Sequence, residues 1–291
     1  MHVAVDQGPV VQSAMLRSEL TQLRKESGLT HEEVTSELEW PPSKLIKIEG
    51  GRSSLTSADL NALLTRYEIS SEDTRERLQT LNRGALEPAW WARYAGDIGR
   101  SYLEFVGFET GASFIRQYEN AFVPGTLQTP EYAEAVTVGL ADPTQVASVV
   151  ALRLRRQSEL AMRAVPPRRY YVMDEAVIRR HVGMSTDSAI MPNQIRSIAD
   201  KAEADDSVTV RVMPFAAGAH RGLLGAFTLL EFDGSLPDVL YIDAGRGEQA
   251  IMFQGNDVVA DYRSDFAALL EDALPVDRSI HLLRRVAEEM S

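Results

Sequence analysis

The sequence contains no cysteine, which excludes disulfide bonds, thiolate metal sites and cysteine nucleophiles. It also lacks any run of about 18 apolar residues, the length that a membrane-spanning helix requires. The N-terminus has neither the basic start nor the apolar centre of a secretion signal, so we expect a cytoplasmic protein that does not contact a membrane. The five histidines are scattered and match no metal-site spacing, and we therefore expect no metal and no other cofactor.

Positive charge is scarce, because 30 Lys and Arg face 42 Asp and Glu and the formal net charge is −12. A protein that coats nucleic acid without regard to sequence needs a basic surface, so that class is excluded. A sequence-specific reader needs only local positive charge. Residues 13–83 carry 10 cationic and 12 anionic side chains, whereas residues 84–291 carry 20 and 29, so the acidity lies mainly in the second part.

The 291 residues, of which 44% are hydrophobic and 25% charged, are typical of a globular protein with two domains. Residues 1–12 contain Gly8 and Pro9 and show no helical period, so we expect a flexible N-terminal arm there. Residues 13–83 predict an all-α domain of five helices. Residues 84–291 alternate helical and strand-like segments and predict an α+β domain with a mostly antiparallel sheet.

In the first domain, Leu16, Leu20 and Leu23 are spaced four and three apart, which predicts a helix that Gly28 ends. Two further helices are predicted at residues 57–67 and 71–83. Between these lie two short helices. The earlier one begins at Thr30, which forms a capping box with Glu33. Two consecutive prolines, residues 41 and 42, then interrupt the chain, and the later short helix covers residues 43–49.

Two short helices joined by a sharp turn suit the major groove of double-stranded DNA, whose width admits one α-helix. We expect Pro42, Ser43, Lys44 and Lys47, at the exposed start of the later helix, to reach base edges or phosphates. Lysine binds either guanine or a phosphate, and the sequence leaves both open.

Additional phosphate contacts are expected at Thr30 and His31, where the start of a helix offers free N–H groups, and at Arg52. The alternative is a small helical bundle with a solvated face. This alternative stays open because the basic signal is small and Glu37, Glu39 and Glu49 lie nearby.

Residues 28–34 read GLTHEEV and residues 43–49 read SKLIKIE. This pattern resembles the helix-turn-helix of the Xre family (Cro/repressor-like), which implies a lambda-repressor-like DNA-binding domain. Four positions depart from the family's pattern, one of them His31, which stands where a glutamine usually opens the earlier short helix. Glu39 replaces a turn glycine, which costs strain if a positive φ is needed. Ile46 replaces a small serine, and Lys47 replaces an arginine and loses the planar fork for bidentate contacts.

The second domain also contains family-like motifs. Residues 122–133 read FVPGTLQTPEYA, and further motifs lie at residues 153–157, 174–176, 212–215 and 227–230. Together they resemble the domain that follows such a helix-turn-helix in actinobacterial regulators described as antitoxin-like (Scr-type). The resemblance implies a regulator encoded beside a small partner protein that it binds or counteracts.

Elements of the second domain follow from periodicity and β-branched content. Helices are predicted at residues 102–121, 130–140, 143–164, 191–204, 257–273 and 276–290. Strands are predicted at residues 169–173, 208–213, 226–232, 239–243 and 249–253.

Four residues of this domain are candidate partner or ligand contacts: Arg153, Arg156, Gln157 and His220. The arginines also fit a solvated helix face, and an acidic partner is the alternative. A lone loop histidine is often incidental. Asp174 and its neighbour at 175 favour an ion-paired surface over acid-base chemistry, so we expect no enzyme.

Taken together, the sequence predicts a DNA-binding transcriptional regulator, a homodimer on an inverted repeat, because one small reader buries limited surface. Two alternatives stay open. In one, the protein is an antitoxin-like module that mainly binds a small protein encoded by an adjacent gene. In the other, the second domain senses a small-molecule effector.

Overall fold

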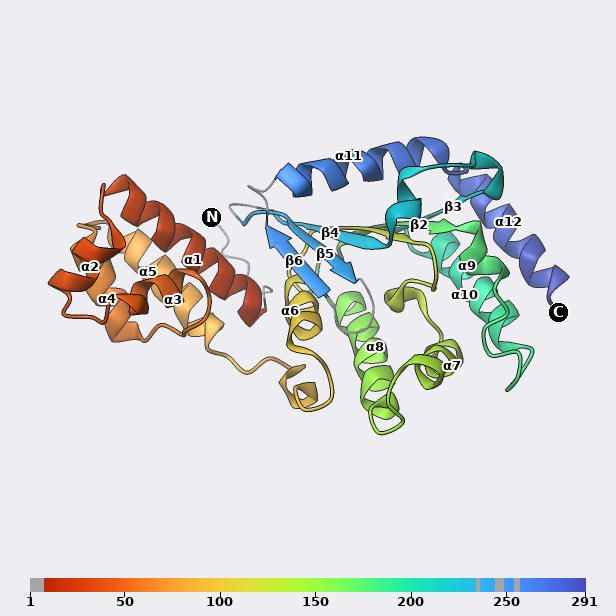
Figure 1. Ribbon diagram of the computed structural model, residues 1–291, viewed down its shortest axis with the longest axis horizontal. Helices are drawn as coiled ribbons and strands as arrows, with labels where there is room; N and C mark the ends of the chain where they lie inside the picture. Colours follow the sequence, from red (N-terminus) through yellow and green to blue (C-terminus); the bar gives the residue numbers. More distant parts are fainter. Residues whose placement is uncertain (1–7, 234–235, 244–248, 254–256) are drawn as a thin grey trace. The chain divides into compact units, whose positions relative to one another are not determined.

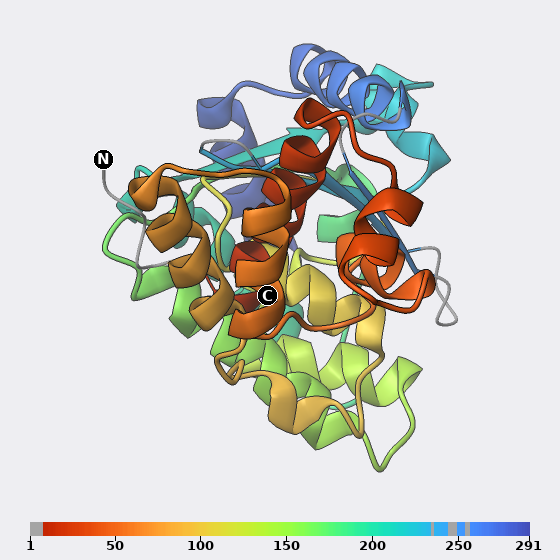
Figure 2. The ribbon, with the colours of Figure 1, turned by 90° about the vertical axis from the view of Figure 1, so that its left-hand side faces the viewer.

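The computed structural model describes residues 8–233, 236–243, 249–253 and 257–291. The chain divides into two compact units, the first ending at Trp90 and the second beginning at Trp91. Each unit is described by itself (Figures 1 and 2). The sequence placed the boundary between residues 83 and 84, but the last helix of the first unit extends to Ala85.

The first unit consists of five helices around one apolar core, which confirms the predicted all-α domain. The helices are α1 (Pro9–Glu26), α2 (His31–Glu37), α3 (Ser43–Glu49), α4 (Ser57–Arg66) and α5 (Glu72–Ala85). Every helix contributes leucine, valine or isoleucine to the core. Its fully buried members include Leu20, Val34, Leu45, Leu60, Leu63, Leu64 and Leu78.

The expected flexible arm over residues 1–12 is wrong for its last residues, because α1 begins at Pro9. Proline is well tolerated at the first helical position, where its missing N–H has no helical partner in any case. Val11 is fully buried, so this first turn is packed as well as helical. Residues 1–7 lie outside the described residues.

The second unit is built on a six-stranded mixed sheet in the order β3-β2-β1-β4-β5-β6 (Figure 1). The strands are β1 (Phe114–Glu119), β2 (Arg168–Asp174), β3 (Val208–Met213), β4 (Phe227–Glu231), β5 (Val239–Asp243) and β6 (Gln249–Phe253). β1, β2 and β3 are parallel, and β4, β5 and β6 join them by antiparallel pairs. The described pairings are therefore antiparallel in the majority, and the predicted α+β class is confirmed.

Helices cover both faces of this sheet. Successive residues of a strand point to opposite faces, so neighbouring residues of β2 belong to different cores. Tyr171 belongs to the core that includes α7 (Pro130–Leu140), α10 (Ile190–Ala204) and α12 (Val276–Glu289). Val172 belongs to the core formed with α11 (Asp257–Asp272), which lies over the other face in Figure 1. The remaining helices are α6 (Arg100–Glu109), α8 (Val146–Ala161) and α9 (Glu175–Arg179).

One predicted element is wrong. Residues 102–121 were expected to form one helix, but α6 ends at Glu109 and residues 114–119 form β1. β1 is paired on both sides, with β2 and with β4, so its backbone hydrogen bonds come from segments distant in the sequence. Within the described residues, no helix combines the length and the apolar composition that crossing a bilayer requires.

Candidate nucleic-acid interface

Helices α2 and α3 and the five residues between them form the predicted pair of short helices with a sharp turn. Val34 of α2 and Leu45 and Ile48 of α3 point into the core. The opposite face of α3 is therefore left to solvent, which is the arrangement that a major-groove reading helix requires.

The turn after α2 uses a left-handed residue, as the replaced glycine suggested. Glu39 has a φ of 54°, and the N–H of Trp40 donates to the carbonyl of Thr35 at 2.8 Å. Helices α1 and α3 end with the same hydrogen-bond pattern, but there the left-handed residues are Gly28 and Gly51. Glu39 therefore holds a conformation that costs a side-chain-bearing residue roughly 1–2 kcal/mol.

The N-terminus of α2 is closed by the predicted capping box. The N–H of Glu33 donates to Oγ1 of Thr30 at 3.2 Å, and Oε2 of Glu33 accepts from both the N–H and the hydroxyl of Thr30 at 2.8 Å. These bonds hold the pKa of the Glu33 carboxyl below its usual value. A phosphate at Thr30, which the sequence predicted, would have to compete with this carboxylate.

Helices α1, α2 and α3 meet at a buried ion pair. Arg24 donates to the two carboxylate oxygens of Glu49 at 2.7 and 3.0 Å and to the carbonyl of Leu29 at 2.9 Å. Both charged side chains are only 9% exposed. Nε2 of His31 lies 3.0 Å from Oε2 of Glu49, and because a carboxylate only accepts, the imidazole donates there.

This cluster bears on two sequence predictions, the negative charge of Glu49 near the DNA contacts and the phosphate contact of His31. Burial by itself raises the pKa of Glu49, but hydrogen bonds from Arg24 and His31 outweigh it and hold the pKa below the usual value. The charge of Glu49 is thus neutralised by Arg24, and it does not offset the positive charge of the predicted DNA contacts. His31 has only Nδ1 left for the predicted phosphate contact, and as a donor this atom requires the imidazolium form.

The solvent face of α3 carries three of the four predicted contacts in exposed positions: Pro42, Ser43 and Lys47. Lys47 has no ion-pair partner in the part of the chain that the structure describes. Ile46, beside it, is 46% exposed. In the sequence, Ile46 stands out only as a departure from the family's pattern, although the helical period places it on the outer face of α3.

Lys44 differs from the other three. Its Nζ lies 2.7 Å from Oδ1 of Asp59 and 3.9 Å above the centre of the Trp40 ring, and the side chain is 31% exposed. The ammonium group is therefore held inside the unit by an anion and an aromatic ring. A role of Lys44 in DNA binding remains a prediction, but it would require part of this arrangement to open.

Two arginines flank the end of α3. Arg52 is exposed and has no ion-pair partner among the described residues. Arg17 of α1 covers Gly51, because a Cβ placed on this glycine would lie 1.3 Å from a guanidinium nitrogen. Arg17 was not among the residues predicted from the sequence, since only the packing of α1 against α3 brings it to the same end of the helix.

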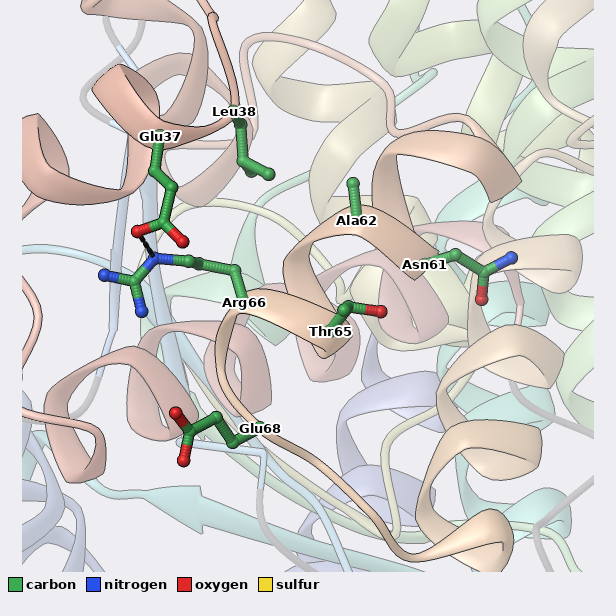
Figure 3. A pocket seen from close by; sticks show the side chains of 7 residues that line it. All are labelled: Glu37, Leu38, Asn61, Ala62, Thr65, Arg66 and Glu68. Atoms are coloured by element: carbon green, nitrogen blue, oxygen red, sulfur yellow. Dashed lines mark ion pairs between the residues drawn. The ribbon is translucent and has the colours of Figure 1, made fainter.

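A shallow pocket of about 440 Å³ lies between the end of α2 and the end of α4 (Figure 3). Its lining consists of Glu37, Leu38, Asn61, Ala62, Thr65, Arg66 and Glu68. Arg66 pairs with Glu37 at 2.6 Å, so the one cation of the lining is already neutralised. With a second carboxylate, that of Glu68, this pocket is unsuited to a phosphate.

In the second unit, the expected solvated arginine face is wrong for Arg156. This side chain is 6% exposed and donates to the carboxylate of Glu109 at 2.7 and 2.8 Å. Its guanidinium also lies over the Tyr102 and Phe105 rings. Burial removes Arg156 from the side chains that a partner can contact.

Arg153 and Gln157 are likewise used inside the domain. Arg153 donates to Oγ1 of Thr137 at 2.9 Å, and Gln157 donates to the carbonyls of Gly125 and Gln128 at 3.0 and 2.8 Å. The Arg153 bond ties α8 to α7, and the Gln157 bonds tie α8 to residues 125–128, part of the motif at 122–133. The motifs at residues 122–133 and 153–157 therefore contact each other inside the domain.

His220 is not an incidental loop residue. Its side chain is 4% exposed, Nε2 lies 3.5 Å from Oδ2 of Asp174, and the ring meets Tyr118 edge to face at 6.1 Å. Neither Nδ1 of His220 nor the hydroxyl of Tyr118 has a hydrogen-bond partner among the described residues. Tyr118 and Asp174 lie near the carboxyl ends of β1 and β2, the edge where parallel sheets usually bind ligands.

Elsewhere in the second unit, Glu175 pairs with Arg179 at 2.6 Å, but the predicted ion-paired surface is wrong, because Asp174 and Glu175 are both buried. Across the described residues, no group of three histidine, aspartate or glutamate side chains is arranged to hold a metal ion.

Two family models match the chain. A helix-turn-helix domain model matches residues 16–78, and a model described as a domain of unknown function (DUF5753) matches residues 102–285. No curated protein and no solved structure matches significantly. The first unit is thus a helix-turn-helix domain, as its geometry indicates. Because the second model covers more than half of the chain, the chain belongs to the DUF5753 family.

Proposed function

We propose that the protein is a sequence-specific transcriptional regulator of the Xre type, which inserts α3 into the major groove of double-stranded DNA. One observation carries this proposal: the outer face of α3 presents Ser43, Ile46 and Lys47 to solvent while Leu45 and Ile48 anchor it from beneath. Arg52 follows at the end of the helix, where it suits a phosphate.

Neutralisation of nearby acids supports the same proposal. Two of the glutamates that diluted the basic signal are paired with arginines, Glu49 with Arg24 and Glu37 with Arg66. Lys47 and Arg52, the exposed cations on and after α3, take no part in these two pairs. Local positive charge therefore exists on a chain with a net charge of −12.

We further propose that the protein acts as a homodimer on an inverted repeat. A reading helix of seven residues reaches only a few base pairs, so one copy alone gains little specificity. Two-fold pairing doubles the contacts and matches half-sites one helical turn apart.

Replacing Lys47 by alanine is expected to weaken binding to the protein's own promoter about tenfold or more, because each lost contact to a base or phosphate costs about 1–3 kcal/mol. Footprinting and gel shifts with the full-length chain measure this. The matched control is Arg285→Ala, which removes another exposed cation, on α12. Binding by Lys47→Ala as tight as by the wild type would refute the reading role of α3.

The variant Lys44→Ala distinguishes a contact between Lys44 and DNA from a stabilising role of Lys44 within the helix-turn-helix unit. If Lys44 only stabilises the unit through Asp59 and Trp40, the variant loses stability but keeps its preference among DNA sequences. If Lys44 reads a base, that preference relaxes.

A second candidate role is effector binding by the DUF5753 domain, with no catalytic step. Nδ1 of His220 and the hydroxyl of Tyr118, which have no partner among the described residues, favour it, because buried polar groups normally have partners and a ligand can supply them. A metabolite that raises the Tm of the wild type but not that of His220→Phe would support this role.

The antitoxin-like alternative rests on the motif resemblance of residues 122–133 and of the related segments. Co-purification with the product of the neighbouring gene tests it. Since Arg156 is buried, a partner would have to bind other side chains of this domain.

A further inference from the structure

Ile46 is unusual within the helix-turn-helix unit. Of the large apolar side chains in α1 to α5, it is the one that is more than a third exposed, at 46%. Every other valine, leucine, isoleucine and methionine in these helices is buried or half-buried. The unit thus turns its apolar residues inward with one exception, and this exception lies on the helix proposed to read DNA.

The exposed residues of α3 form one stripe. Ser43, Ile46, Lys47 and Gly50 are spaced at i, i+3, i+4 and i+7, which places them on a single helix face. Gly50, the residue that follows α3, contributes no side chain, so the side chains of the stripe are those of Ser43, Ile46 and Lys47. The stripe offers a hydroxyl, an apolar group and a cation side by side.

The edges of bases in the major groove are mainly hydrogen-bond donors and acceptors. The exception is the C5-methyl group of thymine, which is apolar and distinguishes thymine from cytosine. We propose that Ile46 contacts the C5-methyl group of one thymine in each half-site and thereby sets the sequence preference at that position. This inference rests on the proposed function, because it requires α3 to enter the major groove.

The test replaces thymine by deoxyuridine, which removes the methyl group and leaves every hydrogen bond in place. Each thymine of the footprinted site is exchanged in turn, in both half-sites together. For the full-length wild type, one exchange is expected to weaken binding about fourfold per half-site. For Ile46→Ser, the same exchange is expected to have no effect, while Ile46→Val retains part of it.

The matched control is Leu86→Ser, which removes the exposed apolar residue that follows α5 and is expected to keep the deoxyuridine effect. Circular dichroism and sedimentation of both variants verify fold and oligomeric state. Two outcomes overturn this inference alone. In one, no deoxyuridine exchange changes the affinity for the protected site. In the other, an exchange weakens binding of Ile46→Ser as much as binding of the wild type. Loss of the dimer in Ile46→Ser overturns it too, by placing Ile46 between subunits. Absence of any protected site overturns both this inference and the proposed function.

Discussion

Replacing Glu49 by alanine is expected to lower the free energy of unfolding of the helix-turn-helix unit by about 3 kcal/mol. Removal of one partner from a buried ion pair typically costs about 3–5 kcal/mol, because the other charge stays buried without compensation. The lower end applies because Arg24 and Glu49 each keep 9% exposure. Since stabilities of domains are about 5–15 kcal/mol, this is a large fraction of the total.

Hydrogen exchange of the full-length protein measures the effect, because it reports α1, α2 and α3 separately from the second unit. The matched control is Glu26→Ala, which removes an exposed carboxylate whose side chain accepts from Gln22. This control is expected to change stability by less than about 1 kcal/mol. Equal protection in both variants would show that the Arg24–Glu49 pair does not hold the three helices together.

The same pair predicts an acid-labile unit. The pKa of Glu49 is below its value of 4.5 in the absence of interactions, so the folded state binds its proton less readily than the unfolded state. The stabilisation is therefore fully present above about pH 4.5 and is lost as the pH falls through the lower, folded-state pKa. In Glu49→Gln, protection of these helices is expected to depend less on pH over this acidic range.

Replacing Arg156 by alanine is expected to lower the stability of the second unit by about 3–5 kcal/mol, because Glu109 is 3% exposed and would be left as a buried, unpaired charge. The variant also loses the stacking of the guanidinium on the Tyr102 and Phe105 rings. Hydrogen exchange of α6 and α8 in the full-length chain measures the loss.

The double variant Arg156→Met with Glu109→Leu distinguishes charge burial from packing. Apolar residues of similar volume often replace a buried pair without loss, so most of the stability is expected to return. The matched control is Arg155→Ala, since the neighbouring arginine is 47% exposed and pairs with Glu159 one turn away. It is expected to cost less than about 0.5 kcal/mol. If Arg155→Ala costs as much as Arg156→Ala, the burial argument is wrong.

Much of the first unit was predictable because its signals are local. The capping box of Thr30 and Glu33 and the left-handed turns at Gly28 and Glu39 depend on residues within one helical turn of each other. The apolar period likewise determines which face of α3 turns outward, so exposure of Ser43 and Lys47 followed from the sequence. The strand β1 was not predictable in this way, because its pairing with β2 and β4 outweighs a local pattern that also fits a helix.

Charge was where sequence reasoning was least informative. A count of charged residues gives the net charge, but the effect of each charge depends on its partner. Only the tertiary structure pairs Arg24 with Glu49 and Lys44 with Asp59, and only packing buries Arg156 and brings Arg17 beside Gly51.

The sequence by itself therefore determined the helix-turn-helix, its caps and its outward face, because these depend on contacts between residues a few positions apart. The tertiary structure decided which cations remain available for DNA and where the central strand lies. It also brought His220 and Tyr118 together, each with a polar atom that has no partner in the described part of the chain. These features depend on burial and on partners far away in the chain, which no local pattern specifies.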